Sequence, residues 1–217
     1  MRDETASPPP GRWAQAWPDA LAFGAGLALA WFGDWQTKDL VWSLWLSSLL
    51  VGYAMIVWDI FGTRALGSPG FVPPTIGMAR AAVLFGQIFL LAFFTVHFGM
   101  FHFVHGTFLN GFFPLEPGWH GVPGPRLFVH VLADYWPFVL VAAVAERKAF
   151  RRKVTLPGTD GMIGPYKNVI RLHLLIFFFA FTSFMRLQNF AIYAVVYAVY
   201  FFPWRLIKGP EAISGKL

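Results

Sequence analysis

The sequence contains no cysteine among its 217 residues. This absence excludes disulfide bonds, thiolate metal ligands and a thiol nucleophile, so a bound metal would need histidine or carboxylate ligands. Charged residues are also scarce, because they make up 13% of the chain, whereas a typical soluble protein has about a quarter. The chain also lacks a polar stretch long enough to form a separate soluble domain.

The composition instead is that of a membrane protein. Hydrophobic residues make up 57% of the chain and aromatic residues 19%. At this length we expect residues 1–217 to form a single transmembrane domain surrounded by membrane lipids. The net charge of +6 comes from basic residues beside apolar segments, where they orient the chain in a membrane. We therefore expect no nucleic-acid binding.

The apolar segments predict an all-α, polytopic transmembrane helix bundle. A membrane-spanning helix needs about 20 mostly apolar residues. The segments that approach this length are residues 39–59, 81–107, 127–146, 168–186 and 188–204.

A sixth segment, residues 13–33, is less apolar because Asp19 interrupts it and Pro18 lies near its start. Proline is tolerated in the first turn of a helix, so we expect this segment to be a span and residues 34–38 to join it to the next one. The sequence therefore predicts six spans. The alternative is five spans plus a re-entrant first segment.

The distribution of basic residues predicts the orientation. With six spans, every lysine and arginine except Lys38, Arg126 and Arg186 lies on the side of the two termini. Because lysine and arginine are enriched on the cytoplasmic side, we expect a multi-pass protein of the cytoplasmic (inner) membrane with both termini in the cytoplasm. Residues 1–12 are then a flexible cytoplasmic tail, and residues 108–126, rich in aromatic residues, form an extracytoplasmic lid-like loop.

Three histidines lie in an otherwise apolar stretch, VHFGMFHFVHG, at residues 96–106. His102 and His105 are three residues apart, so they share a helix face, as do His130 and Asp134, which are four apart. These two pairs lie at similar depths near the outer ends of neighbouring spans, and His97 lies nearer the middle of the membrane.

Ionisable residues inside a membrane are costly and often mark a functional site. Three nitrogens and one carboxylate form a donor set that suits zinc, copper or iron. Haem with an axial histidine at either level, such as His97 or His173, is an alternative. Neutral imidazoles that simply form hydrogen bonds between helices are another. The predicted metal ligands are His97, His102, His105, His130 and Asp134.

Two stretches resemble a known family. VHFGMFHFVHG, together with PYKNVIRLH at residues 165–173, resembles an uncharacterised family of bacterial integral membrane proteins, a domain of unknown function. The resemblance implies the helical membrane architecture but no activity. It emphasises His97, His105 and His173 as cofactor-binding residues. The sequence departs from the family pattern at Trp58 and Asp59, which weakens the case for Asp59 as a site residue.

The sequence leaves several functions open. A zinc ion with an open coordination position would activate water, with Asp134 or Glu116 as the base, and the protein would be a membrane hydrolase. A haem would support electron transfer. Without a cofactor, the same polar residues would serve a small transporter or a proton relay. The remaining interpretation is an accessory subunit of a membrane complex or a homo-oligomer. Whether the protein is an enzyme stays undecided at this stage.

Overall fold

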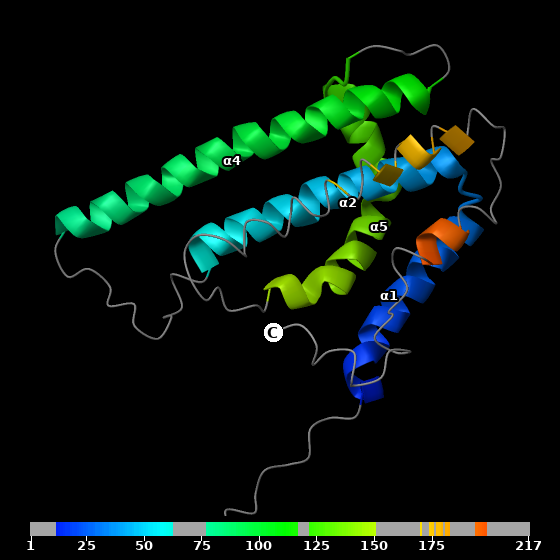
Figure 1. Cartoon of the computed structure of the whole chain (residues 1–217), viewed down its shortest axis with the longest axis horizontal. Helices are drawn as coiled ribbons and strands as arrows, with labels where there is room; N and C mark the ends of the chain where they lie inside the picture. Colours follow the sequence, from blue (N-terminus) through cyan, green and yellow to red (C-terminus); the bar gives the residue numbers. More distant parts are fainter. Residues whose placement is uncertain are drawn as a thin grey trace, which may run out of the picture.

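The structure is a computed structural model in which every described element is a helix (Figure 1). It describes residues 12–62, 77–116 and 122–150, together with residues 170, 174–175, 177–179, 181–182 and 194–198. The helices are α1 (Arg12–Phe32), α2 (Thr37–Val57), the π-helical turn η1 (Trp58–Gly62), α4 (Gly77–Phe112) and α5 (Pro125–Phe150).

These helices confirm the predicted all-α class. Three of them are long and apolar enough to cross a membrane, over Thr37–Phe61, Ala81–Phe112 and Pro125–Arg147. Most of the predicted segments 168–186 and 188–204 lies outside the described residues, and the residues of those two segments that are described are helical. The count of six spans therefore stays a prediction.

The loop between the predicted segments 81–107 and 127–146 is shorter than the sequence predicted. We expected residues 108–126 to form a loop, but α4 continues as a helix through Phe112. Leu109 and Asn110 are buried, so packing of this last turn favours the helical conformation. Pro114 ends it, because the residue before a proline disfavours helical backbone angles.

A tight turn joins α1 to α2, close to the connection that the sequence predicted. Asp34 has a φ of 50°, the left-handed conformation that commonly ends a helix. The Trp35 N–H donates to the carbonyl of Ala30 (2.9 Å), and the Asp34 N–H donates to the carbonyl of Trp31 (3.3 Å). These two bonds form a Schellman motif, which turns the chain directly into α2.

The helices pack in the spatial order α1, α5, α2, α4, so α2 lies between α4 and α5 (Figure 1). In the apolar stretch of α2, 67% of the residues are buried, compared with 11% in α4. A helix that is apolar on all sides is expected in such an interior position. The position of α2 therefore decides which faces of α4 and α5 are buried.

Small residues allow α2 and α4 to approach closely, as is usual between membrane helices. The ring of Phe98 in α4 packs onto Gly52 of α2, where an added Cβ would lie only 2.7 Å from Phe98 Cζ. Gly106 faces the ring of Trp45 in a similar way. The indole N–H of Trp45 also donates to the backbone carbonyl of His102 (2.9 Å). These contacts fix how α4 is rotated against α2.

An ion pair ties the other ends of α1 and α5 together. Nη1 of Arg147, near the end of α5, donates to Oδ1 of Asp19 in α1 and to the carbonyl of Val144. Both charged side chains are about four-fifths buried. Paired burial of this kind makes the loss of either partner costly, so this contact holds α1 against α5 at the end opposite the α1–α2 turn.

Gly52→Ala and Gly99→Ala are a matched pair that tests the α2–α4 contact. Gly52→Ala is expected to lower the free energy of unfolding by about 1–3 kcal/mol, because Phe98 is fully buried and cannot move away without strain. Gly99 has open space around an added Cβ, so Gly99→Ala is expected to be neutral or to stabilise by up to ~1 kcal/mol. Equilibrium unfolding in mixed micelles measures both values, and equal effects would contradict the packing.

Candidate functional site

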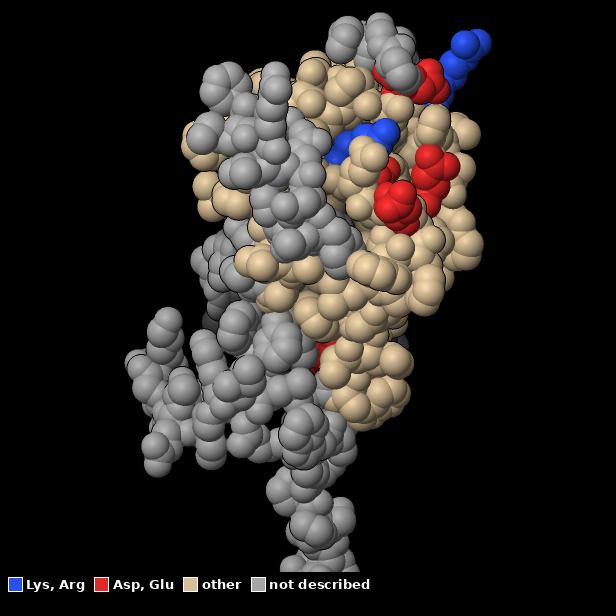
Figure 2. Space-filling model, turned by 90° about the vertical axis from the view of Figure 1, so that its right-hand side faces the viewer, with Lys and Arg blue, Asp and Glu red and all other residues tan. Residues whose placement is uncertain are grey.

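Charged side chains gather at the end of the bundle where α1 turns into α2 and where α4 connects to α5. Figure 2 shows acidic and basic residues together in the upper part of the view, while the rest of the visible described surface carries little charge. Asp39 lies in the first turn of α2, Glu116 follows α4, and His130 and Asp134 lie in the first turns of α5. Three separate elements therefore place titratable groups at one end.

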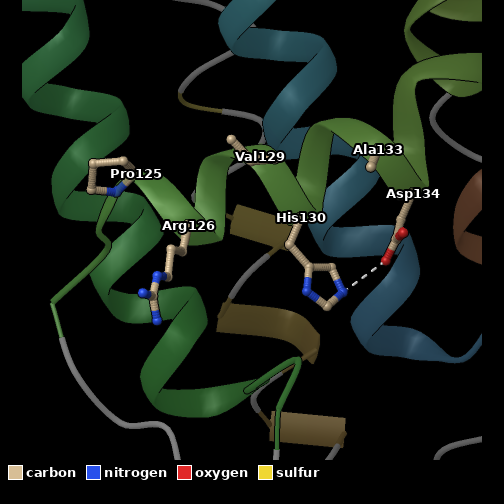
Figure 3. Close-up of a pocket in the computed structure, with 6 residues that line it drawn as sticks. All are labelled: Pro125, Arg126, Val129, His130, Ala133 and Asp134. Carbon is tan, nitrogen blue, oxygen red and sulfur yellow. Dashed lines mark ion pairs between the residues drawn. The ribbon is translucent and has the colours of Figure 1, made fainter.

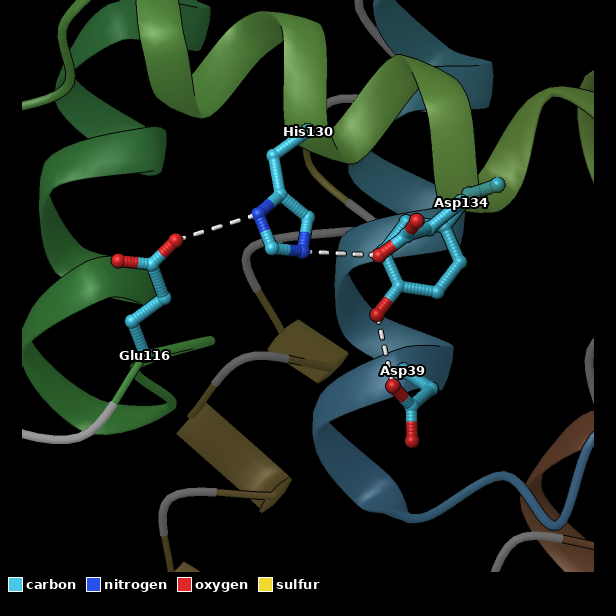
Figure 4. Close-up of polar contacts among 5 residues, drawn as sticks. Asp39, Glu116, His130 and Asp134 are labelled. Carbon is cyan, nitrogen blue, oxygen red and sulfur yellow. Dashed lines mark hydrogen bonds and ion pairs between the residues drawn. The ribbon is translucent and has the colours of Figure 1, made fainter.

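The imidazole of His130 lies between two carboxylates (Figure 4). Its Nε2 is 2.9 Å from Oδ2 of Asp134, and its Nδ1 is 3.4 Å from Oε1 of Glu116. A neutral imidazole has a single N–H, whereas a protonated one donates from both nitrogens. Each ring nitrogen of His130 therefore faces a carboxylate oxygen, and only a protonated ring could donate to both. The His130 side chain is 40% exposed, so water reaches it.

A second contact connects the cluster of Glu116, His130 and Asp134 to α2. The hydroxyl of Tyr135, the residue after Asp134, donates to Oδ1 of Asp39 (2.7 Å; Figure 4). The other oxygen of Asp39 accepts the backbone N–H of Gln36 (2.8 Å), which caps the start of α2. The positive end of the α2 dipole also favours a carboxylate here. Asp39 thus joins the first turn of α2 to α5 beside His130.

An open groove of about 460 Å³ runs along this part of α5. Arg126, His130 and Asp134 project to the same side of the helix, and Val129 and Ala133 lie between them (Figure 3). Pro125, the first residue of α5, also lines the groove. The groove therefore combines two basic groups, a carboxylate and an apolar wall.

The two histidines predicted near the outer end of α4 are buried against α2. His102 is 1% exposed, as is His105, and their ring centroids are 6.3 Å apart. Nδ1 of His102 lies 3.0 Å from the carbonyl of Phe98, and its Nε2 lies 3.3 Å from Oγ of Ser48. Because a carbonyl only accepts, Nδ1 carries the proton, and Nε2 holds the lone pair when the ring is neutral.

His97 lies on a different face of α4. Its ring is exposed and stacks on Phe93, with centroids 5.5 Å apart, and it meets Phe101 edge-on at 5.2 Å. The sequence predicted that His97 would be a metal ligand together with His102 and His105. The structure instead separates His97 from the buried histidines, because packing against α2 turns their face inward and leaves that of His97 outward.

The predicted set of metal ligands is not brought together in the described part of the chain. Trp45 of α2 packs against both His102 of α4 and Phe128 of α5, so it occupies the region between α4 and α5. Among the described residues, no group of three or more histidine, aspartate or glutamate side chains is arranged to hold a metal ion. His173 lies outside the described residues. Metal and haem binding stay predictions.

Asp39 and Tyr135, which connect the cluster around His130 to α2, were not predicted from the sequence. Glu116 was predicted only as a base. One signal was available: Asp39 comes three residues after Gln36, a spacing typical of a helix N-terminus. The pairing of Asp39 with Tyr135 depends instead on the packing of α2 against α5, which no local pattern reveals.

Fold and site together define an all-helical protein with helices able to cross a membrane and a histidine–carboxylate cluster at one end of its bundle. The chain belongs to a family of unknown function, DUF6498, whose sequence profile matches residues 7–201. This match confirms the resemblance to an uncharacterised family. No curated protein and no solved structure matches the chain.

Proposed function

We propose that the protein crosses the cytoplasmic membrane six times, with both termini in the cytoplasm. Three helices with the length and apolar character of spans support this topology. So does α1, which is 21 residues long, about the length that a span requires. The concentration of lysine and arginine on the side of the termini supports the orientation. In this topology the cluster of Glu116, His130 and Asp134 lies at the extracytoplasmic end.

We propose further that this cluster takes up and releases a proton, so that the protein is a small proton-dependent transporter or a proton relay without a bound cofactor. The observation that carries this proposal is the position of His130, with a carboxylate at each ring nitrogen. Histidine is the side chain best suited to gain and lose a proton near neutral pH.

The chemistry of the two states differs in a simple way. When His130 holds the extra proton, both ring nitrogens donate, one to Glu116 and the other to Asp134. When the proton leaves, one nitrogen faces its carboxylate with a lone pair, and that contact becomes repulsive. Proton release therefore loosens the tie between the α4–α5 connection and α5, and the open groove gives the proton access to water.

Transition-metal binding is a second candidate, at a different place. It is favoured by the hydrogen bond of His102, whose Nδ1 donates to a backbone carbonyl. This second bond is typical of metal-binding histidines, because it orients the ring and leaves Nε2 for the metal. His105 lies one turn away on the same buried face. In this candidate the two histidines supply the first ligands.

Reporter fusions at both ends of the chain test the topology. A reporter that is active only in the cytoplasm is expected to be active after residue 217 and before residue 1. A reporter that is active only outside is expected to be active when inserted between residues 117 and 121. The opposite pattern at any of the three positions would contradict the proposed orientation.

Proton entry into proteoliposomes tests the proton site. With a pH-sensitive dye inside and an imposed pH gradient, wild-type protein is expected to admit protons faster than protein-free vesicles. His130→Gln keeps a polar side chain but cannot carry the proton, so the rate is expected to fall on the order of a hundredfold. His97→Gln changes a histidine on the exposed face of α4. It is the matched control and should retain the wild-type rate.

Two outcomes of the dye assay contradict the proton site. One is a wild-type rate equal to that of protein-free vesicles, and the other is an unchanged rate in His130→Gln.

Metal analysis of protein purified without chelators tests the second candidate. A stoichiometric transition metal is expected, and it should be lost when His102→Ala and His105→Ala are combined. His130→Ala is the matched control and should keep the metal. Wild-type protein that contains no stoichiometric metal would contradict this candidate.

A further inference from the structure

Arg126 supplies the groove on α5 with a permanent positive charge (Figure 3). Its side chain is exposed, and it forms an ion pair with none of the residues that the structure describes. Asp134, the carboxylate that lines the same groove, pairs instead with His130 at 2.9 Å. Asp134 also lies two helical turns from Arg126, about 12 Å along the axis. The guanidinium group is therefore placed to bind an anion from solution.

The other charged groups of the site restrict the kind of anion. A guanidinium group binds a carboxylate through two parallel N–H donors. His130 is the second basic group of the groove, but its ring nitrogens already face Asp134 and Glu116. Arg126 is therefore the cation that is left for a ligand. A second negative charge on the ligand would lie near Asp134 without a further cation to neutralise it, so the site favours a singly charged carboxylate over a dianion.

The wall of the groove between Arg126 and Asp134 is apolar and short. Val129 and Ala133 line it, and Pro125 adds a further apolar surface. The groove has a volume of about 460 Å³, which is within the range of sites that hold small molecules. Because the polar group of Asp134 ends the wall, the apolar part of a ligand bound at Arg126 is limited to a few carbon atoms.

We propose that this groove binds a small monocarboxylate with a short apolar chain, and that this carboxylate is the solute that moves together with the proton. Arg126 binds the carboxylate group, and Val129 and Ala133 contact the chain. The proposal rests on the proposed proton-dependent transport, because it names the substrate class of that transporter. A carboxylate that moves with one proton carries no net charge, so the membrane potential does not oppose its entry.

Binding of the carboxylate and binding of the proton favour each other. Arg126 and His130 lie four residues apart and project to the same side of α5 (Figure 3), and like charges at this spacing repel. A carboxylate on Arg126 neutralises the guanidinium charge, so His130 holds its proton more readily. The carboxylates of Glu116 and Asp134 beside the ring, and of Asp39 on α2, favour the proton whether or not the ligand is bound. Because such coupling is reciprocal, protonation of His130 in turn tightens carboxylate binding.

Calorimetric titration of the full-length protein in micelles with butanoate tests the binding site. Butanoate is expected to bind about tenfold or more tightly than succinate, which is a dianion, and than butanamide, which has no charge. Arg126→Gln should weaken butanoate binding about tenfold or more, because it removes a charge-assisted pair of hydrogen bonds. Lys38→Gln changes the second residue of α2, which lies outside the groove. It is the matched control and should bind like wild type.

The same titration in buffers of different ionisation enthalpy measures whether binding takes up a proton. At a pH where part of the His130 rings are neutral, the wild-type protein is expected to take up a fraction of a proton for each butanoate bound. His130→Gln should still bind butanoate through Arg126 but without proton uptake. This result would separate the coupling of the two ligands from the carboxylate site itself.

The carboxylate site is overturned if butanoate does not bind, if succinate or butanamide binds equally well, or if Arg126→Gln binds butanoate like wild type. The coupling is overturned if wild-type protein takes up no proton, or if uptake persists in His130→Gln. Circular dichroism and thermal unfolding show whether each variant is folded. Val129→Asp, which places a negative charge on the apolar wall, is a second variant and should also weaken butanoate binding.

The binding experiment and the proton-entry experiment fail in different ways. Butanoate binding is measured in micelles without a pH gradient, so it does not require that protons cross a membrane. Proton entry into proteoliposomes without butanoate binding contradicts the carboxylate proposal and leaves the proton site intact. Butanoate binding without proton entry contradicts the proposed transport and leaves a carboxylate site of another role.

Discussion

The burial of α2 between α4 and α5 determines where the other functional groups lie. Phe98 packs on Gly52 and the Trp45 indole N–H donates to the His102 carbonyl, so α4 presents one fixed face to α2. That face carries His102 and His105 inward and leaves His97 outward. On the other side, Tyr135 donates to Asp39 and fixes the first turns of α5 beside the start of α2. The buried histidines and the cluster around His130 are two consequences of the same packing.

The two groups of histidines differ in what surrounds them. His102 is enclosed, and its ring nitrogens lie near a carbonyl and a hydroxyl, which suits a neutral ring. His130 is half-exposed, and a carboxylate lies beside each of its ring nitrogens. Histidines at the same end of one bundle therefore have different neighbours, uncharged polar groups at His102 and carboxylates at His130. This difference is why we place proton exchange at His130 and the second, metal-binding candidate at His102.

The sequence predicted the described helices because each depends on a local property, a long apolar run. It placed the end of the span in α4 at residue 107, whereas the helix continues through Phe112. It also identified His130 and Asp134 as neighbours, since a spacing of four residues places two side chains on one helix face. The sequence could not predict that α2 would lie between α4 and α5. We expected His102 to lie near His130 because we assumed that α4 and α5 are in direct contact. The pairing of Asp39 with Tyr135 was not predicted, because it depends on the position of α2.

The protonation of His130 is the central claim, and nitrogen NMR of its ring tests it most directly. In the protonated ring, both nitrogens of His130 are expected to carry a hydrogen-bonded proton. Glu116→Gln should weaken the bond at Nδ1, and Asp134→Asn should weaken the bond at Nε2. His102 should retain a proton on Nδ1. Nitrogen signals of His130 that match a freely hydrated imidazolium, and that neither substitution changes, would contradict the account.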